Sequence, residues 1–171
     1  SDRSYLIDLF TKISDAFNGT INAIYNLDGL PDKEFLDAFK QAFSEKSILQ
    51  LSPVFKDENL RKKYKSFFYT NEQLENILEY MDLIGIPSEL YFSEMPGVNK
   101  KDNEDSKKYG EYLKDKYKNI KAVYNYPITI EPASPWTYNP LKYNLKYTPK
   151  SFIDYYNDTK SIFKSFETKL F

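Results

Sequence analysis

Apolar residues recur at steps of three and four along much of this chain, and that spacing lines one side of an α-helix. The clearest stretch lies between Ser4 and Tyr25, where the recurring residues are Leu6, Leu9, Phe10, Ile13, Phe17, Ile21 and Ile24. The pattern predicts a first helix over about residues 4–25. The turn sequence after it predicts that Gly29 ends this helix in the left-handed conformation.

The same spacing predicts further helices over about residues 31–46, 57–69, 70–83, 106–120 and 150–171. Thr70 and Gln73 have the three-residue separation of a capping box. We therefore expect a mainly α protein, a bundle of about six helices in a single helical domain over residues 1–171. Its predicted core includes Leu6, Phe10, Ile13, Phe39, Leu78 and Phe163.

Two stretches interrupt the helical pattern before residue 110. Residues 47–55 are mixed in character and carry Pro53, which favours an extended connection. Residues 93–106 begin with the turn sequence Met95-Pro96-Gly97 and continue with an almost wholly polar run. We expect this second stretch to be an exposed loop.

Residues 122–149 form the least regular part of the sequence. They contain five prolines, at positions 127, 132, 135, 140 and 149, together with the only tryptophan. Proline at this spacing excludes a helix, although short strands near 123–130 remain compatible. Long irregular connections in compact domains usually have a function. We therefore expect an irregular arm over 122–149 within the single domain.

Tyrosine and tryptophan are enriched at protein interfaces, because they combine a large rigid surface with a polar tip. The arm is accordingly a candidate contact with a protein partner or a second copy of the chain. Its candidate partner-binding residues are Trp136, Tyr138, Tyr143, Tyr147 and Tyr126. The alternative is that the arm folds back on its own chain and that Trp136 belongs to the core.

The chain contains neither cysteine nor histidine. Thiol nucleophiles, disulfides, Fe–S clusters and the Ser-His-Asp triad are therefore excluded, as are the commonest ligands of transition metals. Its 5 glycines are isolated, so no glycine-rich phosphate loop is present. These observations predict no catalytic residues, no cofactor and no metal site, and they predict that the chain is not an enzyme.

Charge is divided unevenly along the chain. Residues 1–105 hold 12 basic and 19 acidic side chains, a net charge of −7, whereas residues 106–171 hold 12 basic and 6 acidic ones, a net of +6. A basic region with interleaved aromatic residues is one pattern of nucleic-acid binding. Nucleic acid is nevertheless not an expected partner, because the whole chain carries −1 and its two arginines, Arg3 and Arg61, lie outside the basic third.

Acidic residues at helical spacing are a further candidate feature. Glu72, Glu75, Glu79 and Asp82 lie three and four residues apart, so they share one side of the predicted 70–83 helix. Carboxylates gathered in this way suit a hard cation, but we interpret them as the solvent-facing side of an amphipathic helix. Paired carboxylates also suffice for glycoside hydrolysis.

The leading functional hypothesis is a non-catalytic structural or assembly subunit that acts through protein–protein contacts. The first alternative is a binding module for an anionic polymer or a glycan, and the second is a carboxylate-based hydrolase, such as a small lysozyme-like enzyme. No apolar run approaches the ~20 residues of a membrane-spanning helix, and no signal peptide is visible. A soluble protein without membrane insertion is expected, and its cellular location stays open.

Overall fold

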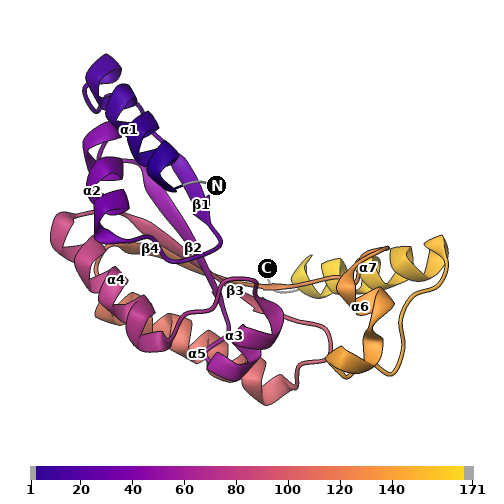
Figure 1. Cartoon of the computed structure of the whole chain (residues 1–171). Helices are drawn as coiled ribbons and strands as arrows, with labels where there is room; N and C mark the ends of the chain where they lie inside the picture. Colours follow the sequence, from indigo (N-terminus) through magenta and orange to yellow (C-terminus); the bar gives the residue numbers. More distant parts are fainter. Residues whose placement is uncertain (1–2, 168–171) are drawn as a thin grey trace.

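The computed structural model describes the backbone of residues 3–167 and the side chains of residues 3–160. Helices and strands alternate along most of the chain (Figure 1). In chain order the elements are α1 (Arg3–Phe17), β1 (Ile24–Leu27), α2 (Lys33–Ala42), β2 (Ile48–Val54), α3 (Glu58–Tyr64), α4 (Asn71–Ile84), β3 (Ser88–Glu94), α5 (Lys100–Lys116), β4 (Ile120–Pro127), α6 (Pro135–Tyr138), the 3₁₀ helix η1 (Pro140–Tyr143) and α7 (Phe152–Glu167).

The four strands form one parallel sheet in the order β1-β2-β3-β4. Ile24 is level with Ile48 of β2, Leu49 with Ser88 of β3, and Ser88 with Ile120 of β4. Parallel neighbours need a long connection, and here each connection contains at least one helix. Such connections are nearly always right-handed. Because the strand order never reverses, they place every connecting helix on the same face of the sheet.

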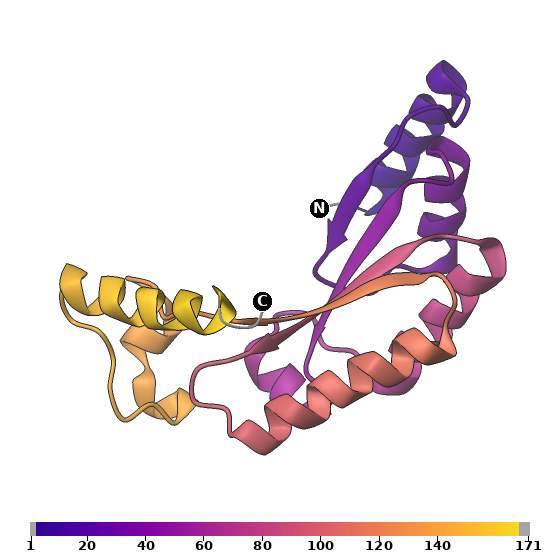
Figure 2. The ribbon, with the colours of Figure 1, turned by 180° about the vertical axis from the view of Figure 1, so that it is seen from behind.

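Figures 1 and 2 show this one-sided arrangement, with α1 and α2 beside β1 and β2, and α4 and α5 beside β3 and β4. The hydrophobic core lies between the sheet and these helices. It is formed by buried side chains from both layers, namely Phe10, Phe35, Leu36, Phe39, Leu49, Leu51, Leu74, Leu78, Met81, Leu90, Phe92 and Leu113. Among the described residues, α1, α2, α4 and α5 all lie on this one face, and none of them covers the opposite face of the sheet (Figures 1 and 2).

Local sequence explains where the helices begin. The side chains of Asp32, Asp57 and Asn99 each accept a backbone hydrogen bond at the first turn of α2, α3 and α5. At α4, Thr70 and Gln73 form the capping box that their spacing predicts, and both of its hydrogen bonds are present. That part of the sequence prediction is confirmed.

The predicted mainly α, six-helix bundle is wrong, because the chain has an α/β fold around a parallel sheet. The strand β1 has only four residues, and each of the four strands lies close in sequence to a helix. The apolar side chains of a strand therefore extend the helical spacing of the neighbouring helix. Ile24 illustrates this effect: it continues the stripe of α1 in the sequence but belongs to β1.

Three element predictions fail for local reasons. The first helix ends at Phe17, because Asn18 and Gly19 both have positive φ, and Gly29 does not end a helix. Residues 47–55 contain β2 rather than a plain connection. The polar run after Gly97 is not a loop but the first part of α5, where Asn99 caps the helix.

The predicted core is largely in place. Phe10, Phe39 and Leu78 are buried, and Leu6 and Ile13 are partly buried against the same cluster. The side chain of Phe163 lies outside the described residues. Much of the predicted irregular arm is regular, because residues 120–127 form β4 and the short helices α6 and η1 follow it. The expectation that proline excludes a helix is wrong here, since Pro135 and Pro140 occupy first-turn positions, where proline is tolerated.

Candidate functional site

The face of the sheet without helices carries a group of polar and aromatic side chains. We call Gln50, Glu89, Tyr91, Tyr124 and Tyr126 the open sheet face. Their neighbours in the strands, such as Leu51, Leu90 and Phe92, point to the helices and are buried. Side chains alternate along a strand, so the open sheet face is the opposite side of the core-forming strands.

Glu89 lies at the centre of the open sheet face. Its Oε2 accepts a hydrogen bond from Gln50 Nε2 at 2.9 Å and one from the Tyr91 hydroxyl at 3.0 Å. Its Oε1 accepts a hydrogen bond from the Tyr124 hydroxyl at 3.3 Å. Among the described residues no ion pair involves Glu89. Its carboxylate is therefore held by neutral donors.

Three tyrosine rings are stacked next to this carboxylate. The ring centroids of Tyr91 and Tyr124 lie 4.8 Å apart, and those of Tyr124 and Tyr126 lie 5.5 Å apart. Desolvation, followed by the hydrogen bond to Glu89, raises the pKa of Tyr91 to about 12. Its hydroxyl therefore stays protonated over the physiological range, where it serves as a donor.

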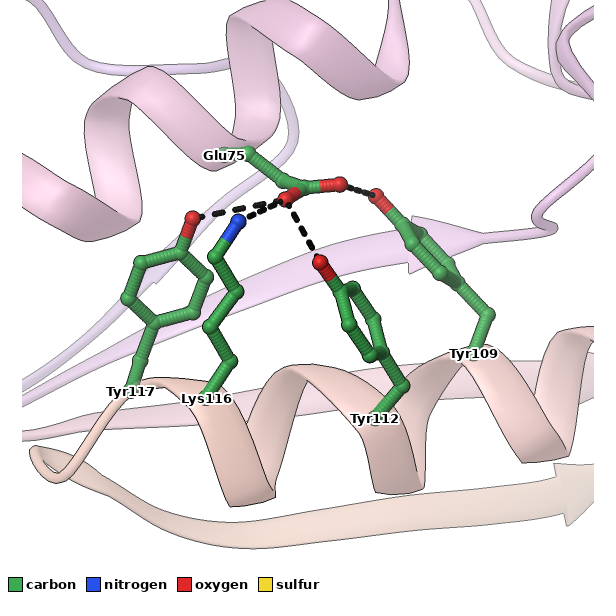
Figure 3. Close-up of polar contacts among 5 residues, drawn as sticks. All are labelled: Glu75, Tyr109, Tyr112, Lys116 and Tyr117. Atoms are coloured by element: carbon green, nitrogen blue, oxygen red, sulfur yellow. Dashed lines mark hydrogen bonds and ion pairs between the residues drawn. The ribbon is translucent and has the colours of Figure 1, made fainter.

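A second carboxylate–tyrosine cluster lies on the helical side and provides a comparison (Figure 3). Glu75 of α4 accepts hydrogen bonds from Tyr109 at 3.0 Å and from Tyr112 and Tyr117 at 3.4 Å each. It also forms an ion pair with Lys116, with 2.7 Å between Nζ and Oε2. The cluster joins α4 to α5 and the residue that follows it, so it has a structural role in the helical layer.

This arrangement revises the interpretation of the acidic side of the 70–83 helix. Glu75 turns to α5, and Asp82 accepts hydrogen bonds from the backbone N–H groups of Lys118 and Asn119. Glu75 therefore joins α4 to α5, and Asp82 joins α4 to the loop before β4. Glu72 and Glu79 are exposed, as the solvent-facing interpretation predicts. Within the described residues there is no group of three or more carboxylate, imidazole or thiolate side chains placed to hold a metal ion.

The carboxyl end of β2 contains a strained turn held by a buried arginine. Val54 has a φ of 67°, which is unfavourable for a β-branched residue, and the register with β3 shifts at this point. The guanidinium group of Arg61 is fully buried and donates to the carbonyl oxygens of Pro53, Phe55 and Tyr69 and to Asn71 Oδ1. Desolvation lowers the pKa of Arg61. Sequence reasoning missed this residue.

A hollow of about 520 Å³ opens beside the carboxyl end of β1. Its lining includes Leu30, Phe67 and Ile77, with Arg3 at its border. Arg3 pairs with Asp32 at 2.5 Å and donates to the Leu30 carbonyl at 2.9 Å. In parallel α/β folds, ligand and partner sites usually lie at the carboxyl ends of the strands, and this hollow has that position.

The segment after β4 leaves the sheet and forms a separate projection, drawn in orange and yellow in Figure 2. We call residues 128–160, with α6, η1 and the described side chains of α7, the C-terminal arm. Six of its large apolar side chains are exposed, namely Tyr138, Leu141, Tyr147, Phe152, Ile153 and Tyr156.

The structure does not bring the five predicted partner-binding residues onto one surface. Tyr138 and Tyr147 are exposed on the C-terminal arm, whereas Tyr126 belongs to the open sheet face. Tyr143 is buried between Trp136 and Tyr64 of α3, with centroid distances of 5.9 and 5.2 Å. Trp136 is half-buried, and its Nε1 has no hydrogen-bond partner among the described residues.

A close backbone approach holds the C-terminal arm to the main body. Gly97 has a φ of 78°, and a Cβ atom at this position would lie 1.7 Å from the Tyr143 carbonyl oxygen. Only glycine fits such a contact in that conformation. The sequence predicts a turn at Gly97, but its contact with the arm depends on the tertiary structure.

The two acidic residues of β3 do not form a catalytic pair. Glu89 lies on the open sheet face, whereas Glu94 is bonded to Asn125 at 2.9 Å beside the start of α5. Five residues of strand separate their backbones by roughly 16 Å. Glycosidases need their two carboxyl groups between about 5 and 9.5 Å apart.

Comparisons with protein-family models, curated proteins and solved structures gave no match for this chain. The function must therefore be argued from its own geometry. In the described part of the chain, every helix is too short or too polar to cross a membrane.

Proposed function

We propose that this chain is a non-catalytic assembly subunit that associates with a second copy of itself through the C-terminal arm. The observation that carries the proposal is the exposure of the arm's apolar side chains. Tyr138 is 71% exposed, Phe152 84% and Leu141 86%. Apolar residues gathered on one projection are typical of a protein interface, whereas scattered single ones are not.

Charge favours a copy of the same chain as the partner. The arm holds four lysines and three acidic residues, a net charge of +1, and residues 1–127 before it carry −3. Two copies therefore offer each other complementary regions. Such complementarity steers association and selects the orientation more than it adds affinity.

The experiment compares the native mass of the wild-type chain with that of Leu141→Glu/Phe152→Glu across a range of concentrations, by sedimentation velocity. We expect the wild type to form dimers or larger assemblies, and the double variant to be monomeric with an unchanged circular dichroism spectrum. Leu83→Glu is the matched control, because Leu83 is an exposed apolar residue of α4 outside the arm. A wild-type chain that stays monomeric at every concentration would refute the proposal.

A second candidate function is glycan binding at the open sheet face. Stacked tyrosine rings beside a carboxylate and an amide supply both the flat apolar surface and the hydrogen-bond acceptors and donors that sugar rings require. Here these are Tyr91 and Tyr124 with Glu89 and Gln50.

Calorimetric titration with neutral oligosaccharides tests this candidate. Binding that is lost in Tyr124→Ala and kept in Tyr5→Ala would support it, because Tyr5 is an exposed tyrosine on α1. Equal affinity in the two variants, or no heat of binding with any oligosaccharide, would exclude glycan binding at the open sheet face.

A further inference from the structure

We propose that two copies of this chain close into one eight-stranded (β/α) barrel, with their open sheet faces turned inward. The inference rests on the proposed assembly function and adds the surface and the symmetry of the contact. Its starting point is the strand order. Four parallel strands in chain order, with every connecting helix on one face, are half of a (β/α)₈ barrel.

A parallel sheet normally has both faces covered. In this chain the right-handed connections leave one face without helices (Figure 2). The second covering layer must therefore come from elsewhere. In a closed barrel it is supplied by the opposite strands, whose side chains fill the interior in layers. The three tyrosines of the open sheet face are large enough to contribute to such a filling.

The two edges of the sheet suit each other. β1 pairs only with β2 and β4 only with β3, so each has a free edge within the described residues. A two-fold axis along the barrel places β4 of one copy beside β1 of the other, and all eight strands stay parallel. The symmetry forms both contacts between β4 of one copy and β1 of the other, which we call the seams, so no strand edge remains unpaired.

The helical layer already contains the number of helices that this arrangement needs. A (β/α)₈ barrel has eight strands and eight outer helices. Each copy supplies four strands together with α1, α2, α4 and α5 on the outer side. Three of these helices, α2, α4 and α5, connect consecutive strands. The fourth is α1, which precedes β1.

The position of α1 supports this role. Phe10 of α1 contacts Tyr25 of β1 and Phe35 of α2, with centroid distances of 6.0 and 5.3 Å. α1 therefore covers the outer side of the edge strand β1. This is the place of the helix that would cover the seam between β1 and an incoming β4.

Ile24 is an apolar residue on that edge, and its side chain is exposed to solvent. Tyr25 points to the helices, so its neighbour Ile24 points to the open side, where its side chain is 70% exposed. In the closed barrel Ile24 faces the interior. The dimer therefore removes an exposed apolar residue from water at each seam.

The position of the C-terminal arm agrees with the same symmetry (Figure 2). The arm follows β4, so it reaches the carboxyl end of the partner's β1. The hollow beside Leu30 and Phe67 lies at this end, and it is the proposed binding site for the exposed apolar side chains of the arm.

The first test compares dimer dissociation by sedimentation in Ile24→Lys and Leu83→Lys. Both residues are exposed and apolar, at 70% and 78%, but only Ile24 faces the proposed interior. A lysine at position 24 is tolerated in a monomer and costly inside a barrel. We expect Ile24→Lys to raise the dissociation constant of the dimer at least about tenfold, and Leu83→Lys to leave it within about twofold.

The second test uses the absence of cysteine from the natural chain. Asn26→Cys on the open side of β1 and Ala122→Cys on the open side of β4 are prepared separately, mixed and treated with a thiol-reactive cross-linker that spans about 20 Å. This length is needed because the shear of eight residues offsets the strands at each of the two seams by about four residues, roughly 13 Å. Ala122 is level with Glu89, which fixes its side. We expect covalent heterodimers from this mixture and none from Asn26→Cys mixed with Leu83→Cys.

The outcomes separate the barrel from the assembly function. A dimer that dissociates in Ile24→Lys and cross-links from residue 26 to residue 122 supports the barrel. A dimer that dissociates only in Leu141→Glu/Phe152→Glu, without that cross-link, overturns the barrel and leaves the assembly function in place. A monomer overturns both.

Discussion

The Tyr91 hydroxyl donates a hydrogen bond to the Glu89 carboxylate from two residues further along the same strand, at 3.0 Å. Both side chains point to the side of the sheet that has no helices. Since an ionised tyrosine would repel the carboxylate, this contact links the titration of Tyr91 to the charge of Glu89.

The first prediction concerns alkaline pH. Desolvation and Glu89 raise the pKa of Tyr91 from 10.0 to about 12. A raised folded-state pKa stabilises the fold fully below pH 10 and loses that contribution as the pH rises to about 12. Tyrosinate absorbance should therefore show a late-ionising tyrosine. In Glu89→Gln this ionisation should move to lower pH, whereas in Glu94→Gln it should not move.

The second prediction concerns Glu75. Burial alone would raise its pKa, but the hydrogen bonds from Lys116 and Tyr109 outweigh burial and lower the pKa below the usual 4.5. Its contribution is thus present above pH 4.5 and is lost as the pH falls through the lowered pKa. Glu75→Gln should reduce the free energy of unfolding at pH 7 by about 1 kcal/mol, after allowance for solvent screening.

Urea unfolding at several pH values measures this effect. The difference between wild type and Glu75→Gln should disappear under acid conditions, where both side chains are neutral. Glu79→Gln, one turn after Glu75 and exposed on α4, is the matched control and should change the free energy of unfolding by less than about 0.5 kcal/mol at pH 7. A deficit of Glu75→Gln that persists at low pH would contradict the assignment.

The third prediction concerns Arg61. Arg61→Met removes the donors that satisfy three buried carbonyl oxygens at the strained end of β2. Unsatisfied buried acceptors cost about 1–3 kcal/mol each before relaxation. We expect a loss of at least about 3 kcal/mol in the free energy of unfolding. Lys62→Met, at the exposed neighbouring position, should change it by less than about 0.5 kcal/mol.

The fourth prediction concerns the attachment of the C-terminal arm. Gly97→Ala should push the arm away from the main body, because the new Cβ atom would overlap the Tyr143 carbonyl. Gly19→Ala is the control: Gly19 also has a positive φ, of 69°, but its nearest atom would lie 3.9 Å away.

The single tryptophan provides the readout for this pair of variants. Trp136 packs on Tyr143, so its emission should shift to the red and become easier to quench in Gly97→Ala. Both variants share the backbone strain of alanine at positive φ, and only the clash differs. Identical emission spectra would show that the Gly97 contact does not hold the arm.

Some of this structure was accessible from the sequence. The capping box of Thr70 and the burial of Phe10, Phe39 and Leu78 follow from local spacing, because both depend on residues within a few turns of one helix. The strands were also signalled. After Pro87, Leu90 and Phe92 lie two residues apart, and the structure shows that Ser88 to Ser93 alternates buried and half-buried side chains, which is the period of a strand.

The sequence does not reveal the fold class, because apolar residues of the strands match the helical spacing of neighbouring segments and the pairing of the strands joins distant residues. In Ile24–Leu27 four residues are too few to establish a period of two, and Ile24 matches the preceding helical stripe. The clusters around Glu75 and Glu89 join residues more than 30 positions apart. No local pattern contains that information, and one sequence alone cannot show which distant residues meet.

The order of the strands also has a consequence for synthesis on the ribosome. Each new strand finds its neighbour already made, 24 residues upstream for β2, 39 for β3 and 32 for β4. The sheet therefore grows by addition at one margin, and no later segment has to be inserted between two earlier strands. Domains that emerge in this way begin to fold from the amino terminus while translation continues. β1 keeps one exposed edge from the start, while the other exposed edge moves to each new strand in turn and ends at β4.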